Sequence, residues 1–429
     1  MRRSRTSLLA LATTASLALT LGACSSGGSD DSAAGTAADP VDLTFYMDKA
    51  GWMDSFDAEN KVSTKEGMQL DVVQTPGSTA DAFDSFVKQS FRTDERPDLF
   101  TWSTGPKLQA LVDQGMVAET TDIWARAEKE GLVPDGLIDN YTYNGKQYCV
   151  PLNVAYWVMY YNKHVFEDAG IKGAPTSWDD MMADADTVKD KGVVPFHQMN
   201  VFFEFVWFQA LLASTDPDAY AGLGTGETKF TDPVVVDVAQ QWLDMMHDGY
   251  FLDPGINTDP QTLLANGDEA MSYFGSFLTG QLNQIGAKSG TDYGVFPFPK
   301  IGPSVDKDQM ILETGPLCVG EGAEHEDQAL RYSEWWLGDD AQQTWADTRG
   351  DVSFNPHVKS GDAEMQALAD RTAKGDFQVQ QRYQEMVPWP VYTKSREVFG
   401  EFVTDAPDDP MDGLKQIQAE ADKYWAEQG

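Results

Sequence analysis

The sequence predicts an α/β fold divided into two lobes, and three observations support this prediction. Short apolar runs alternate with segments of helical periodicity, a pattern typical of parallel α/β sheets. About 390 residues follow an N-terminal leader, which is too many for one hydrophobic core. The stretch 145–171, GKQYCVPLNVAYWVMYYNKHVFEDAGI, predicts two buried strands joined through a proline-containing bend, as expected where the chain crosses between lobes.

The first 40 residues precede the predicted fold. Three arginines and a short apolar run in residues 1–23 predict a secretory signal that is too short to span a membrane as a helix. Leu21-Gly22-Ala23-Cys24 resembles the bacterial lipobox, in which Cys24 becomes the lipid-modified first residue. Residues 24–40 contain no large apolar side chain and predict a flexible tether. We therefore expect an extracytoplasmic protein that the membrane holds by its lipid anchor only.

Charge and cysteine content restrict the partners and the compartment. The chain carries 68 acidic and 31 basic residues, a net charge of −37, which excludes nucleic acid as a partner. With Cys24 assigned to lipid, Cys149 and Cys318 remain as a pair in an oxidising compartment. We predict a disulfide between them, with two buried free thiols as the alternative.

The first predicted lobe begins with strands at 41–47, 68–73 and 97–101. After the last of these, apolar residues at spacings of 3, 4 and 8 predict a helix with one buried face: Leu108, Leu111, Val112 and Met116.

The same alternation returns after the crossing. Asn162-Lys163 and Ser177 predict helix starts, and Asp232-Pro233 predicts another. Residues 313–320 predict a second crossing strand, 328–348 a helix, and 350–356 a third crossing.

Several segments resemble the extracellular solute-binding proteins of family 1, the sugar-binding subunits of ABC importers. They are YCVPLNVAYWVMYYNKHVFEDAGI with PTSWDDMMADADTVKDKGVVPF, RPDLFTWSTGPKLQALVDQGMVAETTDIW, NGDEAMSYFGSFLTGQL, FPFPKIGP and GDVSFNP, in the family's order. The resemblance implies a periplasmic-binding-protein-like fold of type II, with lobes joined by a multi-segment hinge around a ligand cleft. We expect 41–151 with 318–350 to form the N-terminal lobe and 152–317 with 351–429 the C-terminal lobe. One departure is Cys149, where the family often has glycine.

No catalytic or metal-binding pattern emerges from the residues. The sequence contains neither G-x-S-x-G nor H-E-x-x-H, and its five histidines have no ligand spacing. We therefore expect no enzyme activity, no metal and no cofactor.

A carbohydrate site needs aromatic rings for the C–H faces of the sugar and carboxylates or amides for its hydroxyls. Residues that follow strands, crossings or small-residue turns fit these roles. The predicted ligand-binding residues are Asp48, Trp102, Ser103, Trp157, Glu204, Trp207, Phe274, Gly275, Ser276, Glu313, Asp351 and Trp389. Trp157 also matches an aromatic position of the family motif.

Structural alternatives stand beside these roles. Asp48 fits a solvated loop acid equally well, a helix cap is favoured for Ser103, and Ser276 is another possible cap. Most of 202–208, FFEFVWF, is expected in the core, where Glu204 would need a partner. Tyr156 is expected to be structural, and lobe packing competes equally with ligand stacking for Trp389.

The resemblance implies a monomer that captures a mono- or oligosaccharide by hinge closure and delivers it to the ABC permease. A secreted glycoside hydrolase with paired carboxylates is the alternative from another class. A third reading keeps the fold but changes the ligand to an amino acid, a polyamine or a phosphate ester.

Overall fold

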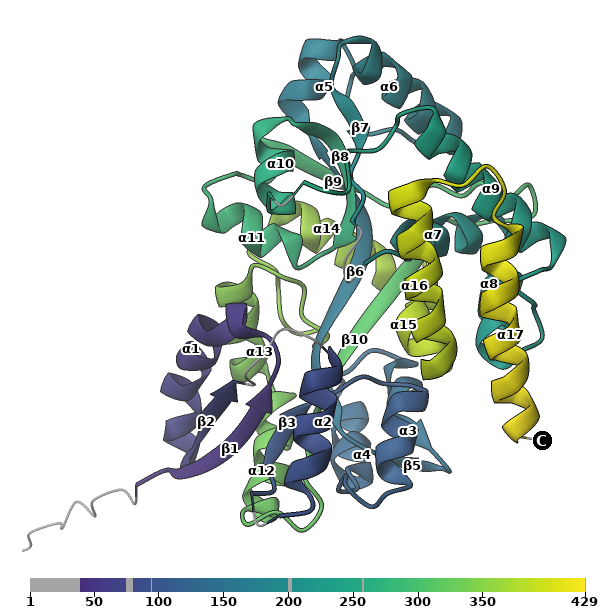
Figure 1. Cartoon of the computed structure of the whole chain (residues 1–429). Helices are drawn as coiled ribbons and strands as arrows, with labels where there is room; N and C mark the ends of the chain where they lie inside the picture. Colours follow the sequence, from purple (N-terminus) through teal and green to yellow (C-terminus); the bar gives the residue numbers. More distant parts are fainter. Residues whose placement is uncertain (1–38, 75–79, 94, 200–202, 257, 429) are drawn as a thin grey trace, which may run out of the picture. The chain divides into compact units, whose positions relative to one another are not determined.

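A mixed β-sheet passes through the part of the chain that the computed structural model describes, residues 39–428 without 75–79, 94, 200–202 and 257 (Figure 1). Its strand order is β2-β1-β3-β10-β6-β8-β7, with β9 paired to β6 and β11 to β10. The strands are β1 (Val41–Met47), β2 (Met68–Gln74), β3 (Leu99–Thr101), β6 (Val150–Asn162), β7 (Val194–Phe196), β8 (Glu269–Gly275), β9 (Tyr293–Phe296), β10 (Gln309–Val319) and β11 (Gln378–Gln381). A separate hairpin pairs β4 (Thr142–Tyr143) with β5 (Lys146–Gln147). The predicted signal, Cys24 and most of the tether lie outside the described residues.

The long strands β6 and β10 pair antiparallel along the middle of this sheet (Figure 1). The prediction of two strands joined by a proline bend was wrong, because β6 is one strand of 13 residues. Pro151 lies opposite Pro316, where the register shifts next to Gly315, so neither proline breaks a regular ladder at that point. The second predicted crossing strand corresponds to β10.

The first group of elements surrounds β1, β2 and β3, which pair in parallel. Its helices are α1 (Met53–Ser63), α2 (Ala80–Ser90), α3 (Pro106–Val112), α4 (Thr121–Glu130), α12 (Glu326–Trp336) and α13 (Asp339–Arg349), with 3-10 turns η1 (Ala50–Trp52), η2 (Thr64–Glu66) and η3 (Leu137–Tyr141). The single helix predicted over 328–348 is therefore two helices, which separate around Gly338.

The second group surrounds β7, β8 and β9. Its helices are α5 (Lys163–Ala169), α6 (Trp178–Asp190), α7 (Val206–Thr215), α8 (Pro217–Thr225), α9 (Pro233–His247), α10 (Pro260–Asn266) and α11 (Leu278–Gln284). The helix starts predicted at Asn162 and Ser177 are confirmed, and the side chains of these residues accept hydrogen bonds from Val165 N and Asp180 N. The helix predicted to begin at Pro233 is also confirmed.

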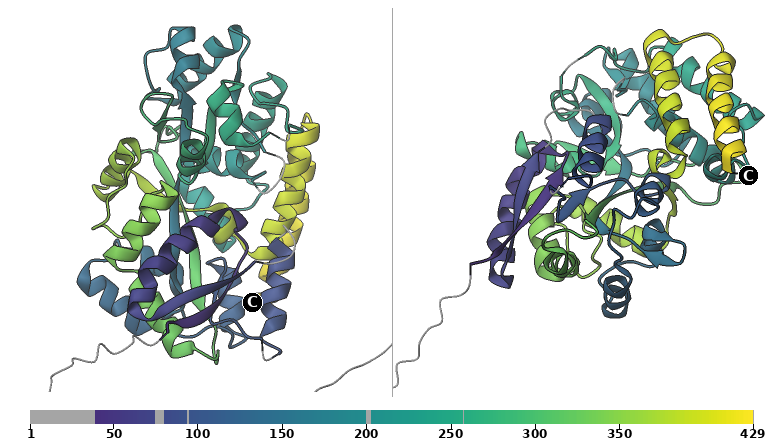
Figure 2. Two further views of the ribbon diagram at one scale, coloured as in Figure 1. Left: turned by 90° about the vertical axis from the view of Figure 1, so that its left-hand side faces the viewer. Right: turned by 60° about the horizontal axis from the view of Figure 1, so that its bottom comes forward.

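The last part of the chain contains α14 (Ala363–Ala373), α15 (Tyr383–Met386), α16 (Trp389–Asp405) and α17 (Met411–Gln428). The right-hand view of Figure 2 shows α16 and α17 side by side, and the two helices are in contact. The predicted third crossing at 350–356 forms no strand; instead β11 pairs in parallel with the first residues of β10. Within the described residues no helix is long and apolar enough to cross a bilayer.

Two clusters of buried apolar side chains lie in the described residues, and β6 and β10 contribute to both. One cluster gathers around β1, β3 and α12 and continues to α11 through Leu278 and Leu282, and the other gathers around α7, α9 and α16. The two-lobed α/β fold predicted from the sequence is thus present. The residue boundaries of the lobes remain predictions.

A disulfide joins the crossing strands at one end. Cys149, immediately before β6, is bonded to Cys318 in β10, with their Cα atoms 4.1 Å apart and both side chains fully buried. Cys149 has a φ of 62°, in the left-handed region that glycine adopts most easily. Its carbonyl accepts hydrogen bonds from Thr120 Oγ1 (2.8 Å) and Trp124 Nε1 (2.9 Å). This backbone geometry gives a physical reason why glycine suits the position.

Candidate functional site

An aromatic cluster surrounds Trp157 where β6 pairs with β8. Trp157 lies opposite Gly275, and its ring centroid is 5.8 Å from that of Phe274, 5.2 Å from Phe203 and 6.2 Å from Phe277. A Cβ on Gly275 would be 2.3 Å from the Phe277 ring, so glycine lets this ring fold over the strand end. Trp157 is fully buried, whereas Phe203 and Phe277 are half-buried. The rings exposed to solvent at this cluster are therefore Phe203 and Phe277, which sequence reasoning missed.

A buried charge cluster fixes Glu313, on β10, beside this aromatic cluster. Trp157 Nε1 donates to Glu313 Oε2 (3.1 Å), and Arg382 Nη1 contacts the same oxygen at 2.6 Å. Arg382 Nε also donates to Glu385 Oε2 (2.8 Å). Burial acts to lower the pKa of Arg382, but Glu313 and Glu385 outweigh it and raise that pKa. Burial raises the pKa of Glu385 despite the neighbouring guanidinium.

A second buried carboxylate, Asp351, is held by the turn after β8. Ser276 Oγ donates to Asp351 Oδ1 (2.6 Å), and the Val352 amide donates to the same oxygen (2.8 Å). Ser276 also exchanges hydrogen bonds with the backbone of Tyr156, so it does not cap α11. Burial raises the pKa of Asp351 to about 6, although Ser276 and the Arg349 guanidinium act to lower it.

Trp102 and Trp389, which belong to different cores, meet at Lys107. The Lys107 Nζ lies 4.7 Å from the Trp102 ring centroid and 4.2 Å from that of Trp389, and 2.7 Å from Asp84 Oδ1. Burial lowers the pKa of Lys107, while Asp84 acts to raise it. Trp102 is only 6% exposed, and its Nε1 donates to the Lys107 carbonyl (3.1 Å). The favoured capping role of Ser103 is wrong, because α3 begins after Gly105 without a side-chain cap.

Asp48 lies on the loop after β1, as the sequence predicted. Its Oδ1 accepts hydrogen bonds from Thr101 Oγ1 (3.0 Å) and Lys49 Nζ (2.9 Å). The side chain is 36% exposed, which makes Asp48 the most accessible of the predicted carboxylates. It remains able to accept further hydrogen bonds from a ligand.

Glu204 and Trp207 contact structural partners in the second core. Glu204 forms a two-pronged ion pair with Arg396, through Nε (3.1 Å) and Nη2 (2.9 Å). Trp207 is fully buried in α7, and its Nε1 donates to the His197 carbonyl (2.8 Å). The partner that the sequence required for Glu204 is therefore an arginine of α16.

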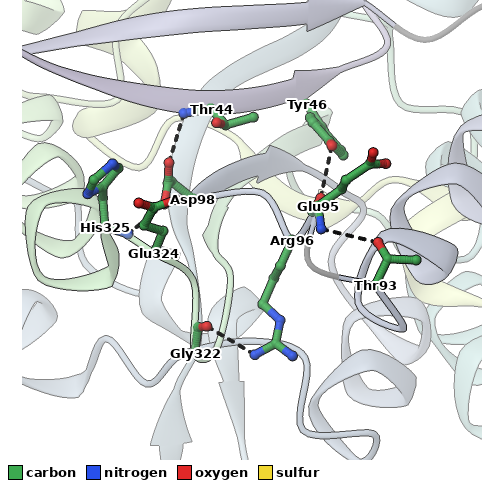
Figure 3. Close-up of a pocket in the computed structure, with 9 residues that line it drawn as sticks. All are labelled: Thr44, Tyr46, Thr93, Glu95, Arg96, Asp98, Gly322, Glu324 and His325. Carbon is green, nitrogen blue, oxygen red and sulfur yellow. Dashed lines mark hydrogen bonds between the residues drawn. The ribbon is translucent and has the colours of Figure 1, made fainter.

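None of the predicted ligand-binding residues lines either of two cavities in the described residues. One, of about 390 Å³, is lined by residues packed with both cores: Gly105, Pro106, Leu108, Gln109, Asp139, Asn140, Thr142, Tyr143, Gly224, Gln381, Glu385, Met386, Pro388, Tyr424 and Trp425. The other, of about 480 Å³, lies in the first group of elements (Figure 3). There Asp98 accepts hydrogen bonds from the Thr44 and His325 amides, both at 2.9 Å, and Arg96 donates to the Gly322 carbonyl. These polar groups hold neighbouring loops together.

The structure thus brings most of the predicted residues into two neighbourhoods, one at Trp157 and one at Lys107, and leaves Trp207 in the core. It adds Lys107, Arg382, Phe203 and Phe277. A glycine followed two residues later by a phenylalanine is the one sequence signal that could have indicated Phe277. Among the described residues, no group of three or more histidine, cysteine, aspartate or glutamate side chains is placed to hold a metal ion.

The chain is similar in sequence to several binding proteins and in structure to solved sugar-binding proteins. A Brucella abortus protein described as a binding protein is 28% identical over 257 residues, which are 57% of this chain and 59% of that protein. The diacetylchitobiose binding protein DasA of Streptomyces coelicolor is 23% identical over 355 residues, 77% of this chain and 78% of that protein. Among solved structures, a chitin oligosaccharide binding protein superimposes with a TM-score of 0.77 at 20% identity, over 90% of this chain and 99% of that one.

At this identity the structural likeness establishes the fold, which is the two-lobed type II fold of solute-binding proteins. The family model for bacterial extracellular solute-binding proteins matches residues 53–373, about three quarters of the chain. This chain belongs to the family of bacterial extracellular solute-binding proteins.

Proposed function

We propose that the protein is the substrate-binding component of an ABC importer, and that it captures a mono- or oligosaccharide between its lobes. The observation that supports this most directly is the gathering of aromatic rings and carboxylates around β6 and β10, the two strands shared by both cores. Half-buried rings at Phe203, Phe277 and Trp389 offer faces for sugar C–H groups, and Asp48 offers acceptors for hydroxyls. The names of DasA and of the chitin oligosaccharide binder are consistent with such a ligand.

In this proposal the ligand shifts the lobes to a closed state by contacting both of them, and the permease then receives the closed protein. The N-terminal lobe comprises 41–151 and 318–350, and the C-terminal lobe 152–317 and 351–429. Residues 1–23 are the signal peptide, and the lipid on Cys24 with the tether holds a monomer at the outer face of the membrane. Radiolabelled palmitate that marks the wild type but not Cys24→Ser would support the anchor, and equal labelling would refute it.

A thermal-shift screen over a carbohydrate panel tests the ligand class. A ligand that binds only the folded protein stabilises it by RT ln(1 + [L]/Kd), about 2.7 kcal/mol at one hundred times Kd. We expect at least one mono- or oligosaccharide to raise the unfolding temperature, and an amino-acid panel serves as the comparison. A response to amino acids and to no sugar would refute the carbohydrate proposal.

A protein that only binds its ligand does not hydrolyse it. A glycoside hydrolase needs two available carboxyl groups, ~5–5.5 Å or ~6.5–9.5 Å apart. Here Glu204 is paired with Arg396, Glu313 with Arg382, and Asp351 with Ser276. Incubation with oligosaccharides should return them intact by mass spectrometry, and shortened products would overturn the binding role.

A further inference from the structure

Lys107 is a buried cation placed between the two cores. Its side chain is only 10% exposed, although lysine normally keeps its ammonium group in water. The Nζ lies over Trp102, which packs in the first core, and over Trp389, which packs against the second. Each ring face attracts the ammonium group through its negative quadrupole. One side chain thus contacts an aromatic ring from each lobe.

The backbones of the two lobes also approach closely beside this lysine. Gly105, two residues before it, has a φ of 68°, and a Cβ at this position would lie 2.0 Å from the Glu385 carbonyl oxygen. The N-terminus of α3 therefore touches α15, just ahead of Trp389 on α16. The Lys107 contact and the Gly105 contact together hold the same two segments against each other.

The faces that Lys107 covers are those that a sugar would need. Carbohydrate C–H groups and ammonium groups both pack on the faces of indole rings. Trp102 is further enclosed by Phe83 and Phe100, with centroids at 6.3 Å in both cases. A sugar therefore cannot stack on Trp102 while Lys107 stays in this position.

We propose that Lys107 is a lobe-bridging residue that holds Trp389 against Trp102 and that a carbohydrate must displace to stack on these rings. The bridge itself stands on the geometry alone, whereas the displacement step rests on the proposed function. Lys107 then acts as an internal competitor of the ligand and sets its apparent affinity.

Hydrogen exchange of the full chain tests the bridge without any ligand. In Lys107→Met, which keeps the aliphatic stem and removes the charge, we expect the segment 383–392 of the other lobe to exchange about tenfold faster than in the wild type. The variant also loses the ion pair with Asp84, so Asp84→Asn, which breaks that pair and leaves Lys107 beside both rings, should leave 383–392 unchanged. Lys88→Met is the matched control, because Lys88 Nζ also lies over Trp102, at 5.6 Å, while its side chain belongs to the same lobe. The control should leave 383–392 unchanged.

Trp389→Leu removes the ring that Lys107 contacts in the second lobe. This variant tests the bridge even if Lys107→Met fails to fold. It should speed exchange in the segment 102–112 of the first lobe. Changes confined to the mutated lobe in both variants, or equal effects of Lys107→Met and Lys88→Met on 383–392, would overturn the bridge.

Calorimetric titration tests the displacement, with diacetylchitobiose as the first probe and then any sugar that responds in the thermal-shift panel. Lys107→Met should bind the sugar about tenfold more tightly than the wild type, a gain of about 1.4 kcal/mol. Equal or weaker binding by Lys107→Met would refute displacement. Absence of sugar binding by every variant would refute the carbohydrate function, while the exchange data would still decide on the bridge.

Discussion

The disulfide between Cys149 and Cys318 closes a loop with a sequence separation of 169 residues. In the chain-entropy description, a cross-link of this span restricts the unfolded chain by about 5 kcal/mol at 25 °C. Removal of the disulfide in Cys149→Ala/Cys318→Ala should therefore lower the unfolding temperature by roughly 10–20 °C, at about 2–4 °C per kcal/mol for a lobe of this size.

The backbone at Cys149 supplies a second, independent part of this prediction. Because its φ is 62°, alanine keeps a left-handed strain that glycine avoids, a difference of about 1 kcal/mol. Cys149→Gly/Cys318→Ala should thus unfold a few degrees above the Cys149→Ala/Cys318→Ala variant.

Scanning calorimetry with and without reductant measures both effects. Reductant should lower the wild-type transition towards those of the variants and should leave the variants unchanged. A Cys149→Ala/Cys318→Ala transition within 3 °C of the wild type would refute the loop-closure argument, and equal stability of the glycine and alanine variants would refute the strain argument.

Three further predictions concern buried charges and the contact between α3 and α15. Burial raises the pKa of Glu59 to about 9, above its value of 4.5 in the unfolded chain. The folded protein therefore binds the Glu59 proton more tightly than the unfolded chain does. The contribution of this residue to the free energy of unfolding is complete below pH 4.5 and is lost as the pH rises towards 9. Glu59→Gln should gain up to about 4 kcal/mol over the wild type between pH 5 and pH 8 in urea unfolding, and a constant difference would contradict this. Arg382→Met leaves Glu313 and Glu385 without their buried cation and should cost about 3–5 kcal/mol in the same assay, with partial recovery on adding Glu385→Gln. Gly105→Ala should separate α3 from α15 at a cost of about 1–3 kcal/mol, seen as faster exchange at 383–392, whereas Gly51→Ala, with open space around its Cβ, should have little effect there.

Local signals in the sequence predicted the elements that local chemistry determines. Asn162, Ser177 and Pro233 mark helix starts because a side-chain acceptor or a preset φ acts within one turn. The prediction failed for β6 because Pro151 normally interrupts a strand, and its tolerance here depends on Pro316, far along the chain. The prediction of a single helix over 328–348 failed because the helical spacing of apolar residues continues across Gly338. The helical hydrogen bonds are nevertheless interrupted there.

In the candidate site, too, the sequence indicated which residue types matter but not which residues pair with one another. A charge within the apolar run 202–208 indicated that Glu204 needs a partner, yet nothing near it identified Arg396, 192 residues later. The sequence around Lys107 resembles that of a surface helix, so nothing in it predicts a buried lysine. Its burial depends on Trp389, which lies on the distant helix α16. Which side chains carry chemistry could be predicted, but which of them meet depends on the tertiary fold.

The pairing of the carboxylates bears on how a ligand could be held. Glu204, Glu313 and Asp351 already contact donors within the protein, so recruiting them to a sugar would leave buried partners unsatisfied, at a cost of about 1–3 kcal/mol each. Asp48 carries no such cost, because its side chain is open to solvent and its partners Lys49 and Thr101 share one of its two oxygens. The affinity for a sugar should therefore come mainly from Asp48 and the half-buried rings. The buried carboxylates instead hold β8, β10 and the segment after α13 in place through their contacts with protein donors.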